Sequence, residues 1–183
     1  MIQELTDCGP SRTYPLYYLE DAMNNLGDCF DYAVNDYGAE GSEVAELFCL
    51  SGVAHEFEHG NAWVVSGKSG VELFALISER SGYQTRSMPD RTYRFEKTPE
   101  YWTGWILAYL QWRLGESFED LLHVVPFDVL RNLYYPWHEA SEERVARLVC
   151  DMAKKAPRQT KLALARKRLK KTQQDLAYES GVS

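Results

Sequence analysis

The five residues from His55 to His59, HEFEH, have the types and spacing of a metal site that activates water. On a helix, histidines four residues apart lie on one face and can hold zinc, while Glu56 takes a proton from the metal-bound water. Zinc also needs a third protein ligand, and the best candidate is Glu79 on the next predicted helix. The set His55, Glu56 and His59 would then hydrolyse a peptide bond.

The surroundings of this motif weaken the zinc hypothesis. Gly52 and Gly60 leave room for at most about two helical turns to hold the ligands rigidly. The longer pattern HExxHxxGxxH fails at Ala62 and Val65. We therefore favour a solvated polar helix end and expect no bound metal, no cofactor and no catalytic residues. A zinc metallopeptidase is kept as the alternative.

The segment from Ala62 to Ser69, AWVVSGKS, fits the loose form of the phosphate-binding loop, with alanine in the first glycine position. That chemistry requires a glycine-rich loop whose backbone amides surround phosphate groups. Here the loop interior is Trp-Val-Val, which is too bulky for a close wrap. Ser69 is better explained as a helix cap, because Glu72 completes a capping box. We therefore expect no nucleotide hydrolysis.

These motifs lie in a chain whose apolar residues recur mostly with helical period. Period, caps and glycine stops predict helices over residues 16–37, 42–50, 53–59, 69–80, 98–114, 117–122, 126–133 and 142–152, with Ser42 as the cap of the second. Residues 63–65 and 92–95 read as short strands that pair. The predicted fold is mainly α, a single multi-helix N-terminal domain with at most one small two-stranded β element.

The helix that follows the segment TPE at residues 98–100 is the most apolar part of the chain. Its threonine can cap the helix, and its proline suits the first turn. One stripe of the helix carries four aromatic side chains, Trp102, Trp105, Tyr109 and Trp112. Because further apolar residues flank this stripe, we expect the helix at the centre of the core and these four side chains mostly buried.

Charge is divided unevenly between a body and a tail. Residues 1–152 hold 11 basic and 25 acidic side chains, a net charge of -14, whereas residues 153–183 hold nine basic and two acidic, a net charge of +7. Clustered cations suit a phosphate backbone, although a charge run can also be a solvated face. Proline and charge follow the last apolar period near Pro157. We therefore predict an acidic domain over residues 1–152, a linker over 153–159 and a separate basic element over 160–183.

Neither a membrane span nor a signal peptide is expected. Apolar runs fall far short of the roughly 18 residues that cross a bilayer, and the N-terminus carries acids where a signal peptide is basic. A cytoplasmic location is the default. In that compartment the four cysteines would be thiols, with Cys29, Cys49 and Cys150 in the core on helices.

The stretch over residues 160–183, TKLALARKRLKKTQQDLAYESGVS, resembles the start of a lambda-repressor-like (Xre) helix-turn-helix. Leu162 and Leu169 match the inward face of its first helix, and Thr172 matches the next cap. The resemblance implies DNA contacts by Arg166, Lys167, Arg168, Lys170, Lys171, Thr172 and Gln173. In such domains the second motif helix enters the major groove. That helix would begin near Ser183, so the motif is incomplete and we expect weak, non-selective DNA binding by this chain.

Three further stretches, YLEDAMNNLGDCFDYAVNDYG, SGKSGVEL and EYWTGWILAYLQW, resemble the N-terminal domain of bacterial Xre-type proteins encoded beside small toxin-like genes. The resemblance implies a partner protein that is a toxin resembling an ADP-ribosyltransferase, and it assigns no metal role to the stretch matching HEFEH. We therefore expect an antitoxin-like transcriptional regulator and not an enzyme. Its N-terminal domain would bind and neutralise the partner, and its C-terminal helix-turn-helix, when complete, would bind operator DNA. A homodimer and a small ligand of the N-terminal domain stay open.

Overall fold

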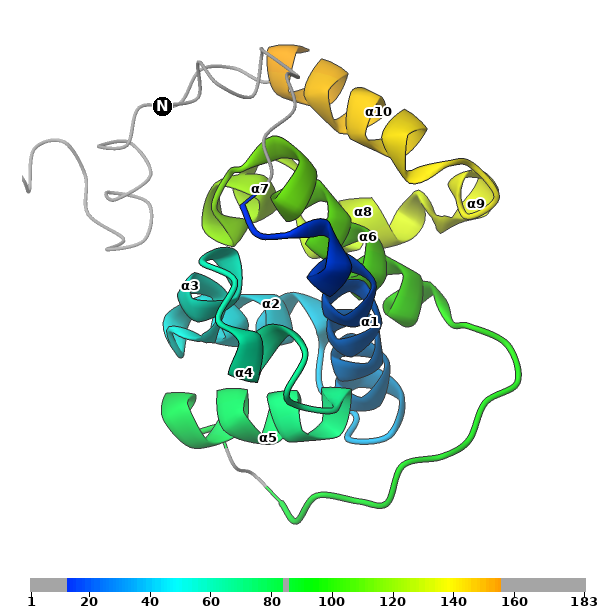
Figure 1. Ribbon diagram of the computed structural model, residues 1–183. Helices are drawn as coiled ribbons and strands as arrows, with labels where there is room; N and C mark the ends of the chain where they lie inside the picture. Colours follow the sequence, from blue (N-terminus) through cyan, green and yellow to red (C-terminus); the bar gives the residue numbers. More distant parts are fainter. Residues whose placement is uncertain (1–12, 84–85, 156–183) are drawn as a thin grey trace, which may run out of the picture.

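The computed structural model describes residues 13–83 and 86–155. The helices in this part are η1 (Leu16–Tyr18, a 3-10 turn), α1 (Leu19–Asn35), α2 (Gly41–Leu50), α3 (Val53–Glu58), α4 (Ala62–Val65), α5 (Gly70–Ser81), α6 (Pro99–Leu114), α7 (Phe118–Val124), α8 (Phe127–Asn132), α9 (Tyr134–Trp137) and α10 (Glu142–Lys155) (Figure 1). No strand occurs among these residues, so the mainly α prediction is confirmed. None of the helices within the described ranges is long and apolar enough to cross a membrane.

The predicted helix starts depend on caps, and most of these caps form. The Ser69 hydroxyl accepts a hydrogen bond from the Glu72 amide, and the Glu72 carboxylate accepts from the Ser69 amide, which is the expected capping box. Thr98 and Ser117 cap α6 and α7 in the same way. The predicted cap at Ser42 is wrong, because α2 already begins at Gly41.

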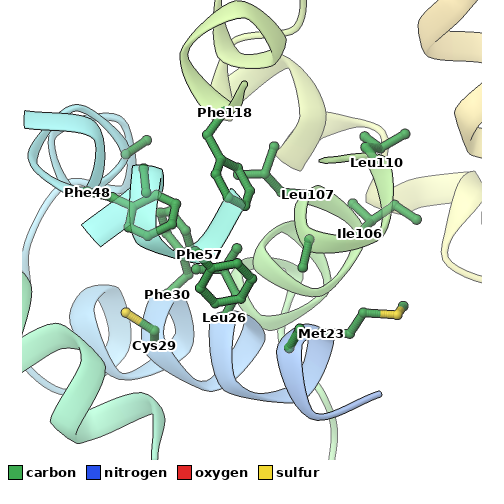
Figure 2. Packing of buried hydrophobic residues seen from close by; sticks show 14 of the residues in the cluster. Met23, Leu26, Cys29, Phe30, Phe48, Phe57, Ile106, Leu107, Leu110 and Phe118 are labelled. Carbon is green, nitrogen blue, oxygen red and sulfur yellow. The ribbon is translucent and has the colours of Figure 1, made fainter. Parts of the chain in front are cut away.

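The core is built around the crossing of α1 and α6 (Figure 1). Glycines let the two backbones approach closely: a Cβ atom on Gly27 would lie 2.9 Å from the carbonyl oxygen of Tyr101, and one on Gly104 would clash with the carbonyl oxygen of Leu26. Around this crossing lie fully buried apolar side chains from five helices, among them Leu26, Phe30, Phe48, Phe57, Ile106, Leu107 and Phe118 (Figure 2). The central position predicted for α6 is therefore confirmed.

The aromatic stripe of α6 is buried at its two ends and partly exposed in between. Trp102 and Trp112 are buried, and the indole Nε1 of Trp112 donates to the carbonyl oxygen of Tyr14 at 2.8 Å. Trp105 and Tyr109 are half-buried and pack against the core, so the expectation of four mostly buried rings holds, with the middle two the more exposed. The Tyr109 side chain extends from α6 toward α10, where its hydroxyl donates to Glu143 at 3.2 Å.

The two strands expected over residues 63–65 and 92–95 do not form. Asn61 caps a helical turn instead, since its side chain accepts from the amide of Trp63 at 3.1 Å, and α4 follows. Residues 86–98, here named the 86–98 loop, connect α5 to α6 without a regular element. The alternation of side chains over residues 92–95 therefore belongs to a loop that packs on α1, and not to a strand of a sheet.

At the C-terminal end of the described residues, α10 runs through Lys155, into the first residues of the predicted linker. The rest of that linker and the element over residues 160–183 lie outside the described residues. Of the predicted core cysteines, Cys29 and Cys150 are buried and Cys49 is half-buried. Cys150 is disulfide-bonded, so the expectation of thiols throughout is wrong at this position.

Candidate functional site

The 86–98 loop lies along α1 and is held there by backbone contacts as well as side chains. The Tyr32 hydroxyl donates to the carbonyl oxygen of Pro89 at 2.7 Å, and the Thr92 amide donates to the Asp36 carboxylate at 3.3 Å. A connection of this length without secondary structure is uncommon in a compact domain, and such connections are usually functional. Its fixed position on α1 makes it the first candidate for a functional element.

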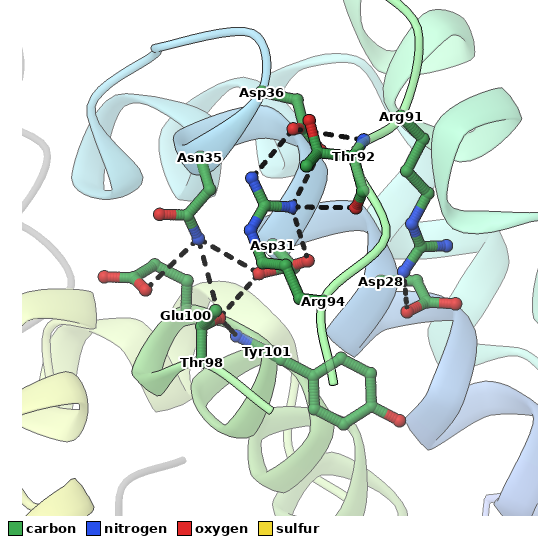
Figure 3. A network of polar contacts seen from close by, with 10 residues as sticks. All are labelled: Asp28, Asp31, Asn35, Asp36, Arg91, Thr92, Arg94, Thr98, Glu100 and Tyr101. Atoms are coloured by element: carbon green, nitrogen blue, oxygen red, sulfur yellow. Dashed lines mark hydrogen bonds and ion pairs between the residues drawn. The ribbon is translucent and has the colours of Figure 1, made fainter. Parts of the chain in front are cut away.

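Arginine–aspartate pairs fasten the loop to one side of α1 (Figure 3). The Arg94 guanidinium donates from two nitrogens to the two carboxylate oxygens of Asp36, at 2.7 and 3.0 Å, and also lies 3.4 Å from Asp31. Arg91 pairs with Asp28 at 2.5 Å. A two-point contact of this kind fixes the direction of the guanidinium as well as its position. The hydrogen bonds from Arg94 hold the pKa of Asp36 below its usual range, so this carboxyl stays charged.

The end of the loop is joined to the start of α6 by a second set of hydrogen bonds. The Thr98 hydroxyl, which caps α6, donates to Asp31 at 2.6 Å, and Asn35 donates to Asp31 at 3.0 Å and to Glu100 at 3.3 Å (Figure 3). Burial acts to raise the pKa of Glu100, but hydrogen bonds from Arg131 and Asn35 outweigh it, and the pKa lies below its usual range. The buried Glu100 carboxylate is thus charged and paired with Arg131.

While Arg91 and Arg94 turn toward α1, the aromatic side chains of the same loop are exposed. Tyr93 is 79% exposed and Phe95 is 92% exposed. The two rings contact each other edge to face, with centroids 5.1 Å apart and planes at 81°. Large apolar side chains presented together to solvent are characteristic of interaction sites. The loop therefore has one set of side chains for anchoring and another that is free for contact.

A cavity of about 390 Å³ lies between the loop, α1 and the start of α6. Asp28, Asp31, Arg91 and Arg94 contribute to its lining, and these charged groups are paired with one another. The Lys97 ammonium, also in the lining, lies 3.6 Å from the ring centroid of Tyr101. Asp28, Asp31, Arg91 and Arg94 thus engage one another, which suits a structural role for this wall of the cavity.

The HEFEH motif folds into α3 and the turn that follows, but its groups are not arranged around one point. The rings of His55 and His59 stack with centroids 4.2 Å apart, and both side chains are exposed. The Glu56 carboxylate, the proposed base, pairs with Arg80 at 2.5 Å and accepts from Asn61 at 3.1 Å. In the part of the chain that the structure describes, no three His, Cys, Asp or Glu side chains are grouped closely enough to hold a metal ion.

The other acidic residue of this motif has a structural contact. Glu58 accepts a hydrogen bond of 2.5 Å from the amide of Phe118, at the start of α7. Burial raises the pKa of Glu58, and this hydrogen bond opposes the shift. Glu79, expected as the third metal ligand, is an exposed residue near the end of α5.

The residues of the loose phosphate-binding pattern are likewise engaged in local structure. Trp63 and its neighbours form α4, and the Lys68 ammonium lies 3.8 Å from the centroid of the Trp63 ring. Ser69 caps α5, as predicted. The predicted DNA-contacting residues Arg166, Lys167, Arg168, Lys170, Lys171, Thr172 and Gln173 lie outside the described residues.

Sequence reasoning missed the loop residues that the structure brings together. The signal was present in the alternation Arg91-Thr92-Tyr93-Arg94-Phe95, which was interpreted as a strand, and in aspartates recurring along α1. Comparisons with protein-family models, with curated proteins and with solved structures found no match. A functional hypothesis therefore rests on the loop geometry and on the sequence resemblance.

Proposed function

We propose that the chain is an antitoxin-like transcriptional regulator whose helical domain binds a partner protein through the 86–98 loop. The observation that carries this proposal is the exposed aromatic pair Tyr93 and Phe95 on a loop that Arg91 and Arg94 hold against α1. Partner binding would cover both rings and remove their apolar surface from water.

Two physical arguments support a protein as the partner. Aromatic side chains supply much of the binding energy in protein interfaces, and a contacting pair of rings makes a compact anchor. A loop already fixed by Arg94 and Asp36 loses less conformational freedom on binding than an unattached loop would. The net charge of -14 over residues 1–152 also favours a partner with a basic surface.

The identity of the partner and the DNA-binding half of the proposal come from the sequence resemblance. On that basis the partner is a toxin resembling an ADP-ribosyltransferase, whose basic substrate cleft an acidic domain could cover. The basic element over residues 160–183 would bind operator DNA once the helix-turn-helix is complete. A partner-binding domain and a DNA-binding element in one chain fit a regulator whose DNA binding is linked to partner binding.

Co-expression with the product of the neighbouring gene tests the partner half. We expect the two proteins to copurify, and the double variant Tyr93→Ala/Phe95→Ala to weaken the complex at least about thirtyfold, as for an interface hot spot. Tyr17→Ala is the matched control, because Tyr17 is 72% exposed and lies on η1, outside the loop. Equal binding by the double variant and the control would contradict a role for the loop.

A titration against the upstream region of the gene tests the DNA half. Replacing Arg166, Lys167 and Arg168 by alanine should weaken binding and flatten its salt dependence, since each phosphate contact releases counterions. A chain whose affinity for DNA is unchanged by these replacements would contradict the proposed DNA contacts.

A further inference from the structure

A further exposed aromatic ring lies on α9, beside the end of the 86–98 loop. Tyr135 is 74% exposed, and its ring contacts that of Tyr134 edge to face, with centroids 4.8 Å apart. The Tyr134 hydroxyl in turn donates to the carbonyl oxygen of Lys97 at 3.1 Å. On the right of Figure 1, α9 therefore lies next to the point where the loop enters α6.

The core holds this end of α9 in place. Tyr134 is half-buried, and its ring meets that of Trp102 on α6 with centroids 5.9 Å apart. On another side the Tyr134 ring stacks on that of His138, with centroids 4.5 Å apart. Tyr135 is therefore presented to solvent from a fixed backbone, as Tyr93 and Phe95 are by the anchored loop.

Only a few contacts separate the Tyr135 ring from the aromatic pair of the loop. Phe95 precedes Lys97 by two residues, so their Cα atoms are at most about 7.6 Å apart. One hydrogen bond and one ring contact lead from Lys97 through Tyr134 to Tyr135. Because a typical protein interface covers about 800 Å² on each partner, one partner can contact the loop and α9 together.

Exposed acids accompany these rings. Glu96 directly follows Phe95 and is exposed. Burial raises the pKa of Tyr134, and the charges of Tyr135 and Glu96 raise it further, so the Glu96 carboxylate lies close to α9. Just beyond α9, the Glu139 side chain is 85% exposed. The surface between loop and α9 thus combines aromatic rings with negative charge.

Two cations near these acids are engaged inside the domain. The Lys97 ammonium lies 3.6 Å from the ring centroid of Tyr101, and Arg131 pairs with the buried Glu100 at 2.5 Å. A cation from another molecule would meet rings and carboxylates at this surface. Among protein cations, the arginine guanidinium suits it best, because a planar and weakly hydrated group can stack on a ring while it pairs with a carboxylate.

We propose that the partner-binding surface extends from the loop onto α9 and receives an arginine side chain of the partner. The guanidinium would lie on the ring of Tyr135 and pair with Glu96, while Tyr93 and Phe95 contact the partner beside it. The inference rests on the proposed function for the role of the loop, and it adds α9 and the chemistry of the recognised group.

The first test uses the full chain and labelled peptides in which glycine alternates with arginine, lysine or citrulline. Citrulline has nearly the shape of arginine without its charge. Fluorescence anisotropy should show saturable binding of the arginine peptide, binding at least about threefold weaker for the lysine peptide, and no saturable binding of the citrulline peptide.

Variants of the chain locate the binding site. Tyr135→Ala and Glu96→Gln should each weaken binding of the arginine peptide about threefold, and the double variant about tenfold. Tyr135→Phe, which keeps the ring, should leave the affinity unchanged. Thermal unfolding of every variant separates lost binding from lost folding.

The matched control is Tyr17→Ala/Glu20→Gln, which also removes one exposed ring and one exposed carboxylate. These residues belong to η1 and α1, outside the loop and α9. We expect this variant to bind the arginine peptide within about twofold of the unchanged chain, because exposed charges at a distance are screened.

The product of the neighbouring gene separates this inference from the proposed function. Tyr135→Ala should weaken that complex about threefold or more. A complex weakened by Tyr93→Ala/Phe95→Ala and not by Tyr135→Ala would overturn the extension to α9 and leave the proposed function standing. A product that does not bind would contradict the proposed function, and the peptide titration would then decide the inference alone.

Several results of the peptide titration would overturn the proposal. Equal binding of the arginine peptide and either comparison peptide would exclude recognition of a guanidinium. Equal weakening by the two double variants would mean general attraction to an acidic domain. A dimer of the chain that Tyr135→Ala dissociates would make a second copy the occupant. Peptide binding that appears only after the cations of residues 161–171 are replaced by alanine would make the chain's own basic stretch the occupant.

Discussion

Two sides of α1 are held by different physics. On the side facing α6, close packing at Gly27 and Gly104 and buried apolar side chains hold the helices together. On the side facing the 86–98 loop, aspartates of the same helix and of its C-cap hold Arg91 and Arg94. The first contact excludes water and leaves no space, whereas the second contains charged groups close to the surface.

Because of this difference, we expect one contact to set the stability of the domain and the other to set the position of the loop. Truncating a buried leucine or phenylalanine costs about 2 to 5 kcal/mol, whereas an exposed ion pair contributes about 0.2 to 1 kcal/mol. The α1–α6 crossing should therefore determine whether the domain folds, and the ion pairs should determine where the loop lies. Each prediction below tests this division, beginning with the largest expected effect.

Gly104→Val should cost about 3 kcal/mol or more in the free energy of unfolding, because its Cβ would meet the backbone of α1 at Leu26. Denaturant titration measures the loss. Gly52→Ala is the control: Gly52 has a positive φ of 77° but open space around its Cβ, so only backbone strain of about 1 to 2 kcal/mol applies. Equal losses in both variants would mean that the crossing is not close-packed.

Trp112→Ala should cost about 3 to 5 kcal/mol, because its ring is buried and its indole nitrogen donates to Tyr14. Trp105→Ala, on the same helix, should cost clearly less, since Trp105 is half-buried. Thermal unfolding of the two variants ranks them. The reverse order would place Trp105 in the core and contradict the structure.

Asp36→Asn should cost about 1 to 2 kcal/mol and release the loop, because the carboxylate accepts two hydrogen bonds from Arg94. Limited trypsin digestion of the folded variant should cut faster after Arg91, Arg94 and Lys97. Asp128→Asn, at an exposed position of α8, is the control and should leave the digestion unchanged. Loop cleavage at the wild-type rate would show that the Asp36 pairs do not fix the loop.

Acid should loosen the loop before it unfolds the core. The pKa of Asp36 is lowered in the folded protein by Arg94, so its stabilising contribution is complete above the ordinary value of 3.8 and is lost as pH falls through the folded-state pKa. The NMR signal of the Thr92 amide, which donates to Asp36, should shift in that window while core methyl signals stay constant. Simultaneous loss of both signals would contradict separate control of loop and core.

The smallest effect is expected at the more exposed of the two arginine anchors of the loop. Asp28→Asn should change the free energy of unfolding by less than about 1 kcal/mol, because Arg91 and Asp28 are both partly exposed. Raising the salt concentration should weaken the wild-type pair toward the behaviour of the variant. A loss as large as that of Asp36→Asn would mean that exposure does not rank these pairs.

The features that could be predicted from the sequence depend on neighbouring residues. The capping box of Ser69 and Glu72 and the cap at Thr98 act within three residues, so local reasoning found both helix starts. At the start of α2, Gly41 packs against Phe127, far away in the chain, and the predicted cap Ser42 lies two residues after the actual N-cap, Glu40.

The loop was missed for the same reason. Arg94 and Asp36 are separated by 58 residues, and the sequence does not show which acid an arginine will meet. The alternation of polar and aromatic residues around Tyr93 is the same for a strand as for a loop that turns every second side chain to solvent. Only the folded position of α1 distinguishes the two.

The loop also has an evolutionary consequence. Arg91 and Arg94 anchor the loop, whereas the rings of Tyr93 and Phe95 contact each other and are exposed. Substitutions at these two positions would therefore leave the fold intact while changing the surface that the loop presents to the proposed partner. In duplicated gene copies, such changes would let each copy diverge toward its own partner without passing through an unstable ancestor.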